Sequence, residues 1–529
     1  MTPGVVPPNP VDQANRVRVA DAVAGLGRVH LVGIGGAGMS GIARILLARG
    51  VTVSGSDAKD SALLAELRGL GATVHVGHDA ANATDADTLV VSSAVRETNP
   101  ELMAARRSGV PVLHRSEALA ALMAGRRVVA VAGTHGKTTT TGMVTVALRQ
   151  CGADPSYAIG GDLTAEGLNA HDGGGDVFVA EADESDGSFL RYSPTIAVIT
   201  NVEPDHLDHY GTAEAVQRAF EAFCLRVVAS GTVVACTDDP GVASVLARVR
   251  PALDAAGVTV RGYGTTPDAQ VRVLDVDTSG FGVTFRLAAD GESHHVRLQV
   301  PGRHNALNAA AAWAAGRALG LGGAQLTAGL AAFGGTRRRF EARGAAVGVR
   351  VYDDYAHHPT EVAAVLRAAR EVAGTGRVLA VFQPHLFSRT RIFATEFAQA
   401  LGLADVVVVL DVYAAREDPE PGVTGALIAD AVPSPADRVH FAADSAAVPA
   451  LVARCARPGD VILTLGAGDV TLLAPRIVAA LEDIGAIEDI GALGDAAALG
   501  DAAALGDAAA LGDAAALGDA AAPARGEGP

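Results

Sequence analysis

VVAVAGTHGKTTTT occupies residues 128–141 and predicts a buried strand, a glycine-rich turn and the start of a helix, in that order. Gly133 and Gly136 permit the tight turn, and backbone N–H groups at the helix start can bind phosphate oxygens. Lys137 can reach the β- and γ-phosphates of a nucleotide, and the Thr138 hydroxyl can hold Mg²⁺. The glycines are three residues apart rather than the five of the common phosphate loop, but the same contacts remain possible. The segment therefore predicts an α/β fold with a nucleotide site; a tight turn without a ligand is the alternative.

Acidic residues follow two later strands of the same block. The first group is Glu181, Asp183 and Glu184 after DVFVA. The second group, which also contains an asparagine and two histidines, is Asn201, Glu203, Asp205, His206, Asp208 and His209 after TIAVI. Because the carboxyl ends of parallel strands form the ligand crevice of a sheet, we expect both groups beside the phosphate loop. Carboxylates there would repel ATP unless Mg²⁺ lies between them, and a histidine can serve a second Mg²⁺ or Mn²⁺ site. For each group alone, a solvated acidic loop is the alternative.

A second glycine motif, GIGGAG, lies at Gly33–Gly38 between a predicted strand and the helix MSGIARILLARG. It fits the pattern G-x-G-x-x-G, with Asp57 after the next strand. Taken alone, this pattern indicates NAD or FAD, but another diphosphate would use the same loop. A strand–helix turn without a ligand is also compatible with it.

Histidine, asparagine and arginine recur in the later part of the chain. His304, Asn305 and Asn308 start a predicted helix, where the amides either cap the helix or recognise a purine. Two consecutive strand ends carry residues suited to an anionic small molecule. These are Asp353, Asp354, Tyr355, His357 and His358 in DDYAHHPTE, and His385, Arg389 and Arg391 in FQPHLFSRTR.

Composition excludes several classes of protein. The chain has 529 residues with a net charge of −17 and 49% hydrophobic residues, which excludes a wholly disordered chain. It has no basic stripe and no apolar run of the roughly 18–20 residues that cross a membrane, so we expect no nucleic-acid or membrane partner. The N-terminus lacks a secretory pattern, and the four cysteines lack metal-ligand spacing, so we expect a cytoplasmic protein. Lys59 and Lys137 are the only lysines beside 40 arginines, and we interpret Lys137 as a position where arginine cannot substitute.

Valine-rich strands alternate with helices and indicate an α/β protein with parallel sheets covered by helices. We expect a flexible N-terminus over 1–20, domains at 21–125, 126–334 and 335–485, and a low-complexity tail over 486–529. In the tail, DAAALG occurs four times in succession from Asp495 to Gly518. Its period of six matches neither a heptad nor a helical turn, so we expect no catalytic role for the tail.

Together, the motifs resemble those of the ATP-dependent Mur ligases of peptidoglycan synthesis. The resemblance covers residues 28–483 and rests on seven motifs in the family's order: HLVGIGGAGMSG, GTHGKTTT, EADESDGSF, TNVEPDHLDHY, GRHNALNAAAA, DDYAHHPTE and FQPH…SRT. It is strongest to the member that joins L-alanine to UDP-N-acetylmuramate. The resemblance implies a Rossmann-like domain for the UDP-sugar, a central P-loop ATPase-like domain, and a Rossmann-like C-terminal domain for the amino acid. It also implies that GIGGAG holds the UDP diphosphate and that no NAD is bound.

The resemblance further implies a role for each matching residue. Catalytic roles fall to Lys137, Glu181 and His206, and metal binding to Thr138, Glu181 and His206. UDP-sugar contacts fall to Gly33, Gly35, Gly36, Gly38 and Ser92. ATP contacts fall to Gly133, Thr134, His135, Gly136, Lys137, Thr138, Thr139, His304, Asn305, Asn308, Arg338 and Asp354. Amino-acid contacts fall to Tyr355, His357 and Arg389.

The implied activity is that of an ATP-dependent carboxylate–amine ligase. ATP would convert the muramate carboxylate to an acyl phosphate, which the amine of L-alanine attacks to give UDP-N-acetylmuramoyl-L-alanine, ADP and phosphate. Mg²⁺ is the implied cofactor, with Mn²⁺ possible at a second site, and we expect a monomer or homodimer. The alternatives are a related Mur ligase that adds another amino acid or a peptide, an NAD-dependent oxidoreductase, and a nucleotide switch without catalysis.

Two positions depart from the family pattern. Leu386 stands where the family often has an arginine, so Arg389 is left as the expected partner of the alanine carboxylate, unless Arg391 joins it. Several relatives use a carbamylated lysine as a Mg²⁺ ligand, but no lysine follows Lys137 in this chain. That ligand is therefore excluded here.

Overall fold

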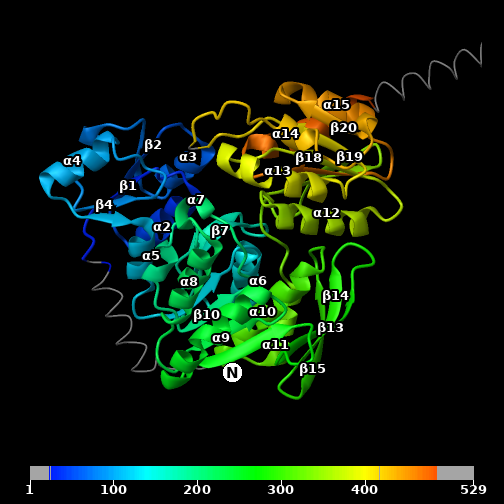
Figure 1. Cartoon of the computed structure of the whole chain (residues 1–529). Helices are drawn as coiled ribbons and strands as arrows, with labels where there is room; N and C mark the ends of the chain where they lie inside the picture. The colour runs from blue at the N-terminus through cyan, green and yellow to red at the C-terminus, as the bar shows by residue number, and fades with distance from the viewer. Residues whose placement is uncertain (1–22, 24, 416, 485–529) are drawn as a thin grey trace, which may run out of the picture.

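The computed structural model describes residue 23 and residues 25–415 and 417–484. Within these residues, three α/β domains surround a common junction, and the first and third domains both lie at one end of the central domain (Figure 1). The predictions for residues 1–20 and 486–529 lie outside the described residues. In the described part of the chain, no helix is both long and apolar enough to cross a membrane.

In the first domain, the described strands form a parallel sheet in the order β3-β2-β1-β4-β5. The order reverses direction at β1, and ligands bind at such a switch point in open α/β sheets. The strands are β1 (Val29–Val32), β2 (Val53–Asp57), β3 (Thr73–Val76), β4 (Thr88–Val91) and β5 (Val112–His114). The helices are α2 (Ala37–Ala48), α3 (Ala62–Gly69), α4 (Pro100–Ser108) and α5 (Arg115–Met123).

The central domain contains a mixed sheet in the order β15-β14-β13-β12-β11-β10-β6-β9-β7-β8 among the described residues. Its strands are β6 (Arg127–Ala132), β7 (Ser156–Leu163), β8 (Leu168–His171), β9 (Val177–Glu181), β10 (Ile196–Ile199), β11 (Thr232–Cys236), β12 (Thr259–Gly264), β13 (Val271–Asp277), β14 (Val283–Ala289) and β15 (Glu292–Leu298). Its helices are α6 (Lys137–Gln150), α7 (Leu207–Tyr210), α8 (Ala213–Cys224), α9 (Pro240–Ala255), α10 (His304–Ala318) and α11 (Gly323–Ala331). β6 lies between β9 and β10, parallel to both. The acidic residues after β9 and β10 therefore lie at the same edge as the phosphate loop after β6.

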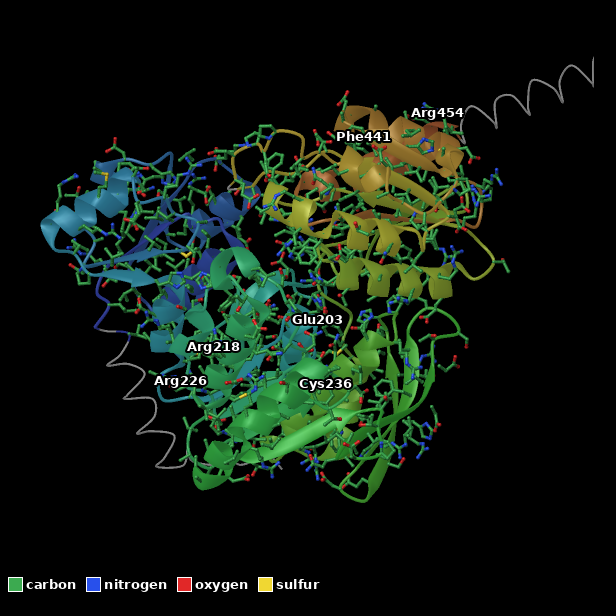
Figure 2. All side chains as sticks on the ribbon, in the orientation of Figure 1. Glu203, Arg218, Arg226, Cys236, Phe441 and Arg454 are labelled. Carbon is green, nitrogen blue, oxygen red and sulfur yellow. The ribbon has the colours of Figure 1, made fainter. Side chains whose placement is uncertain are left out.

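The third domain has strands in the order β16-β17-β21-β18-β19-β20 within the described part, parallel except for β16. The strands are β16 (Glu341–Ala346), β17 (Val349–Asp354), β18 (Val378–Phe382), β19 (Val406–Leu410), β20 (Val439–Ala442) and β21 (Val461–Leu465). The helices are α12 (Pro359–Ala373), α13 (Phe387–Leu401), α14 (Ala426–Ala429) and α15 (Val448–Cys455). The first turns of α12 and α13, which follow β17 and β18, contact the central domain through Thr360 and Arg389, near the position of Glu203 (Figure 2).

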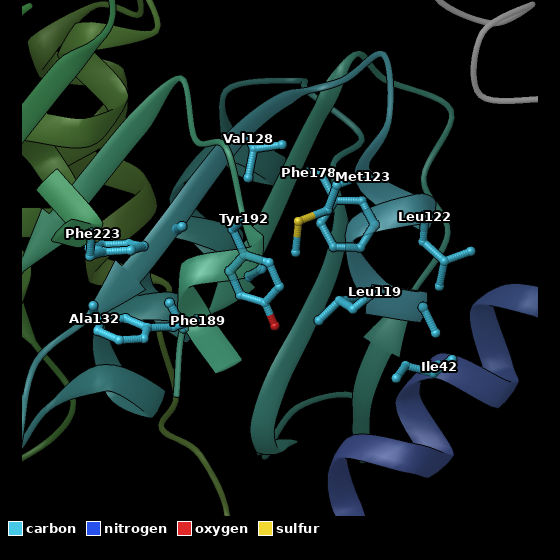
Figure 3. Packing of buried hydrophobic residues seen from close by; sticks show 14 of the residues in the cluster. Ile42, Leu119, Leu122, Met123, Val128, Ala132, Phe178, Phe189, Tyr192 and Phe223 are labelled. Carbon is cyan, nitrogen blue, oxygen red and sulfur yellow. The ribbon is translucent and has the colours of Figure 1, made fainter. Parts of the chain in front are cut away.

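One hydrophobic cluster joins the first two domains. Ile42 of α2 and Leu119 of α5 belong to the same buried cluster as Phe178 of β9 and Phe223 of α8 (Figure 3). Separating these domains would expose such side chains to water, and each exposed side chain would cost roughly 1.5–3 kcal/mol of free energy. The buried clusters of the third domain contain residues from 340–484 alone, as far as the chain is described. The first two domains should therefore move as one body, whereas the third can move against them.

Candidate active site

The three domains border one open cavity of about 1900 Å³. This volume exceeds the roughly 300–1,000 Å³ of a site for one small ligand, so it has room for more than one substrate. A second cavity of about 200 Å³ lies behind the phosphate loop. Except for Gly133, each residue to which the resemblance gives a ligand contact lines one of the two cavities. The larger has Gly33, Gly35, Gly36, Gly38, Ser92, Thr134, His135, Gly136, Lys137, Thr138, Glu181, His206, Arg338, Tyr355, His357 and Arg389, and the smaller has Thr139, His304, Asn305, Asn308 and Asp354. Gly133 contacts a lining residue of the larger cavity, because Lys137 donates a hydrogen bond to its carbonyl.

The phosphate loop has the predicted strand–turn–helix form. Gly133 and Gly136 have φ values of 139° and 74°, which favour glycine, and α6 begins at Lys137. A Cβ atom on Gly136 would lie 2.7 Å from Asn308 Oδ1. Glycine is therefore required at 136 by both the backbone conformation and the close approach of α10. The amides of α10 do not cap that helix, because Asn305 donates to the Pro301 carbonyl and Asn308 donates to Asn305.

Lys137 is the cation of this loop and is held in place by three contacts. Its ammonium group donates to the carbonyls of Gly133 and Thr134 at 2.7 and 2.9 Å, and to Glu184 Oε1 at 2.9 Å. Burial lowers the pKa of Lys137, but the attraction of Glu184 and the other nearby carboxylates outweighs burial, and the net pKa is raised. Lys137 is therefore charged at neutral pH, as phosphate binding requires.

Thr138, Glu181 and His206 lie on the acidic side of the loop, where Mg²⁺ was predicted. Thr138 Oγ1 lies 3.1 Å from Glu181 Oε1, and His206 Nε2 lies 3.8 Å from Glu184 Oε1. Glu184 Oε2 is buried and has no hydrogen-bond partner among the described residues. Burial lowers the pKa of His206, so its imidazole is neutral and able to bind a metal. The Thr138 hydroxyl and the Glu181 carboxylate fit Mg²⁺, and the neutral imidazole of His206 fits a second Mg²⁺ or Mn²⁺ ion.

The third domain contributes a buried guanidinium at this edge. Arg389 of α13 donates to Asp205 Oδ1 at 2.8 Å, and both side chains are less than a tenth exposed. Burial raises the pKa of Asp205, but Arg389 and His206 outweigh it, and the net pKa is lowered. The expected carboxylate-binding arginine therefore already bridges two domains. His357 lies nearby, and burial lowers its pKa to about 3, so it is neutral.

The adjacent arginines 338 and 339 serve different parts of the site. Arg338 donates to the carbonyls of Gly466 and Gly468 at 2.6 and 3.1 Å, within its own domain. Arg339 instead lies 3.5 Å from Thr138 Oγ1 and 3.9 Å from Glu361. Although Arg338 was the predicted ATP contact, Arg339 is the closer to the phosphate loop.

The glycine loop of the first domain offers backbone donors without a cation of its own. Gly33 has a φ of 76°, Gly36 caps α2, and the Gly35 amide donates to Asp57 at 3.0 Å. Arg115 of α5 approaches this loop, since a Cβ atom on Gly38 would lie 3.3 Å from Arg115 Nη1. Arg115 also donates to Asp183 at 2.6 Å, directly after β9. Arg115 thus links the glycine loop of the first domain to the acidic segment after β9, and no sequence pattern had indicated it.

Comparison with known families covers all three domains. Residues 28–127 match the model described as "Mur ligase family, catalytic domain", residues 131–316 the "Mur ligase middle domain", and residues 338–468 the "Mur ligase, glutamate ligase domain". The chain belongs to the Mur ligase family. The predicted family and the three-domain α/β fold class are therefore confirmed.

Individual Mur ligases are similar over nearly their whole length. The UDP-N-acetylmuramate–L-alanine ligase of Kineococcus radiotolerans is 61% identical over 467 residues, covering 88% of this chain and 98% of the relative. That of Saccharopolyspora erythraea is 59% identical, covering 88% and 95%. Among solved structures, the UDP-N-acetylmuramate–alanine ligase of Thermotoga maritima superposes with a TM-score of 0.71 at 31% identity, covering 85% of this chain and 98% of its own.

Proposed function

We propose that this Mur ligase joins L-alanine to UDP-N-acetylmuramate with hydrolysis of ATP, as a step of peptidoglycan precursor synthesis. The observation that carries the proposal is the shared cavity, in which two phosphate-type glycine loops face a buried arginine of the third domain. Relatives of about 60% identity that bear this activity in their names support the same substrates. The reaction then belongs in the cytoplasm, with a monomer or a homodimer as the active species.

In this proposal, the first domain holds the UDP diphosphate through the backbone N–H groups of Ala37–Met39 in the first turn of α2, because those of Gly35 and Gly36 already donate to Asp57 and to the Gly33 carbonyl. The muramate carboxylate would point across the cavity toward the phosphate loop. Lys137 would bind the β- and γ-phosphates and neutralise charge that develops during phosphoryl transfer. Its present partner Glu184 keeps the ammonium group oriented at the loop.

Thr138 and Glu181 would hold Mg²⁺, and His206 would hold a second divalent ion, Mg²⁺ or Mn²⁺. When bound, these ions supply charge neutralisation between the carboxylates and the phosphates. Transfer of the γ-phosphoryl group converts the muramate carboxylate to an acyl phosphate, and the neutral amine of L-alanine displaces phosphate from it. The acyl phosphate must be shielded from water, and closure of the third domain, which shares no buried cluster with the others among the described residues, would provide this shielding.

The third domain would hold the amino acid. Arg389 is placed to bind the alanine carboxylate in a charge-assisted contact, with Tyr355 and His357 on the same wall of the cavity. The adenine base would lie in the smaller cavity, beside His304, Asn305 and Asn308.

The test is release of phosphate from ATP by the full-length protein. Phosphate release should require UDP-N-acetylmuramate, L-alanine and Mg²⁺ together, and a scan with glycine, L-serine and peptides should rank L-alanine first. A higher rate with a peptide would support the related Mur ligase instead. Reduction of NAD with a muramate substrate and no ATP turnover would contradict the ligase proposal altogether.

A further inference from the structure

Three side chains converge beside the phosphate loop. His135 belongs to the phosphate loop, Glu203 follows β10, and His358 precedes α12 of the third domain. One potential ligand atom from each lies within 4.8 Å of the other two. Glu203 lies in the middle of the molecule, where the central and third domains meet (Figure 2). The cluster therefore joins two domains that share no buried hydrophobic cluster among the described residues.

His358 is the N-cap residue of α12 and packs against Phe393, but its ring nitrogens have no polar role in the described part of the chain. It is 6% exposed, and neither Nδ1 nor Nε2 has a hydrogen-bond partner among the described residues. Its ring centroid lies 5.0 Å from that of His135, so it faces the cluster. A buried, unpartnered polar group is uncommon in folded proteins and indicates an absent ligand or a functional role.

The other two members have the spacing of metal ligands. His135 Nε2 lies 3.4 Å from Glu203 Oε2. Two ligands about 2.1 Å from a tetrahedral Zn²⁺ ion are about 3.4 Å apart, so one ion could contact both with little movement. His358 must come closer to the other two ligands, and its ring can rotate toward them because it makes no hydrogen bond among the described residues.

Two of the three ligands, His135 and Glu203, also have an outer partner. His135 Nδ1 lies 3.4 Å from Glu361 Oε1, an arrangement of carboxylate and histidine that fixes ring orientation at zinc sites. Glu203 Oε2 accepts a hydrogen bond from Thr360 Oγ1 at 2.8 Å. Glu203 is partly exposed, which leaves an entry path for an ion.

We propose that His135, Glu203 and His358 form a binding site for a divalent transition-metal ion of the Zn²⁺ type, separate from the Mg²⁺ site of the proposed function. Two imidazoles and one carboxylate favour Zn²⁺ or Co²⁺ over Mg²⁺, which prefers oxygen ligands. Because the ligands come from both domains, the bound ion would tie the third domain to the phosphate loop. It would act as a clamp that slows the domain movement needed for turnover.

The competing occupant of this site is a proton. Burial lowers the pKa of His135, but Glu203 and Glu361 outweigh it and raise the pKa to about 9. Without an ion, His135 is thus an imidazolium between two carboxylates. A metal ion must displace this proton, and the experiment distinguishes the two occupants by counting ions.

The test uses the full-length chain, stripped of metal and kept in saturating Mg²⁺, with Co²⁺ as the probe. Bound Co²⁺ is counted by equilibrium dialysis and its visible d–d absorption. The wild type should bind one more Co²⁺ per chain than His358→Asn or Glu203→Gln. Glu361→Gln should keep the ion but bind it about 10–100-fold more weakly, because it removes only the outer partner.

Two control variants separate this site from the rest of the molecule. His75→Asn, on β3 of the first domain, should bind as many Co²⁺ ions as the wild type. His206→Asn should keep the ion at the clamp and lose any second ion that His206 holds. Equal counts in the wild type, His358→Asn and Glu203→Gln, each shown to be folded by circular dichroism, would overturn the proposal. Loss of the same single ion in His206→Asn and His358→Asn would also overturn it.

Discussion

Two buried glutamates, Glu101 in the first domain and Glu184 in the central domain, differ in what their oxygens contact. The Glu101 carboxylate accepts hydrogen bonds from Ser56 Oγ at 2.6 Å and Asn82 Nδ2 at 2.8 Å, with His78 Nδ1 at 3.3 Å. Glu184 contacts Lys137 through one oxygen, and its other oxygen has no hydrogen-bond partner in the described part of the chain.

The pKa values of the two carboxyls diverge accordingly. Burial alone raises the pKa of each. At Glu101 the contacts with His30, Ser56 and Asn82 outweigh burial, and the pKa falls to about 2. At Glu184 burial outweighs the attraction of Lys137, and the pKa rises to about 7. A buried carboxylate whose oxygens are all hydrogen-bonded stabilises its domain. A buried carboxylate with an oxygen left without a hydrogen bond, beside a phosphate loop, is typical of a ligand site.

The largest effect on turnover should come from removing the cation that Glu184 faces. Lys137→Ala should lower kcat about 10³-fold, because a group that stabilises the transferring phosphoryl is lost. Steady-state phosphate release measures this, and Lys59→Ala, at the exposed second lysine, is the matched control. A loss below about tenfold, or about 1.4 kcal/mol, would place Lys137 outside the chemistry.

The next largest effect on the kinetics should come from Arg389, the partner of the buried Asp205 carboxylate. Arg389→Ala should raise the KM for L-alanine about 10–150-fold, since a charged contact contributes about 1.5–3 kcal/mol. Arg389→Lys should recover only part of this, because lysine lacks the planar fork. If the KM for ATP rises and that for L-alanine does not, Arg389 serves the nucleotide.

Glu184→Gln tests the comparison directly. We expect activity at limiting Mg²⁺ to fall about 10–100-fold, as for outer partners of metal sites. The free energy of unfolding should change less than in Glu101→Gln, because glutamine removes a buried charge that is incompletely satisfied. A variant with unchanged Mg²⁺ dependence and lower stability would make Glu184 a structural residue like Glu101.

Glu101→Gln should have the opposite outcome. Turnover per folded molecule should stay near the wild-type value, while the first domain loses about 1.5–3 kcal/mol of unfolding free energy at neutral pH. Because the folded pKa of Glu101 is lowered, its contribution is complete above the ordinary value of 4.5 and is lost as pH falls toward about 2. Urea unfolding at neutral and acidic pH measures the difference, which should shrink in acid. A difference that grows in acid would show that the sign is wrong.

The smallest effect should come from the repeat tail. A chain that ends at Asp483 should turn over at the full-length rate, because the repeat offers no ligand beyond scattered aspartates. We expect its solubility to change, because the negative charge of the tail is lost. A hundredfold loss of activity in a folded truncated chain would assign the tail a role in catalysis.

Much of the site followed from local patterns. Gly133 and Gly136 specified the phosphate loop because positive φ values and a tight strand–helix turn depend on neighbouring residues alone. The acidic groups could be brought to that loop because the carboxyl ends of parallel strands share one edge, and β9, β6 and β10 are adjacent. The antiparallel strands β13–β15 that extend the central sheet were not predicted, although Asp290–Gly291, with φ values of 55° and 78° between the alternating strands β14 and β15, is a local hairpin signal.

Only the tertiary structure decided which side chains pair. Glu181 and Glu184 are three residues apart, and only Glu181 was assigned a role from the sequence, yet Glu184 is the one that meets Lys137, while Glu181 meets Thr138. Arg338 has a φ of 57°, so it and Arg339 diverge, one toward its own domain and the other toward the phosphate loop. The sequence by itself determined the family, the α/β class and the type of chemistry, since these depend on motif identity and order. Pairings such as Arg389 with Asp205 and His135 with His358 depend on how the third domain packs against the second, and that distance is set by contacts far apart in the chain.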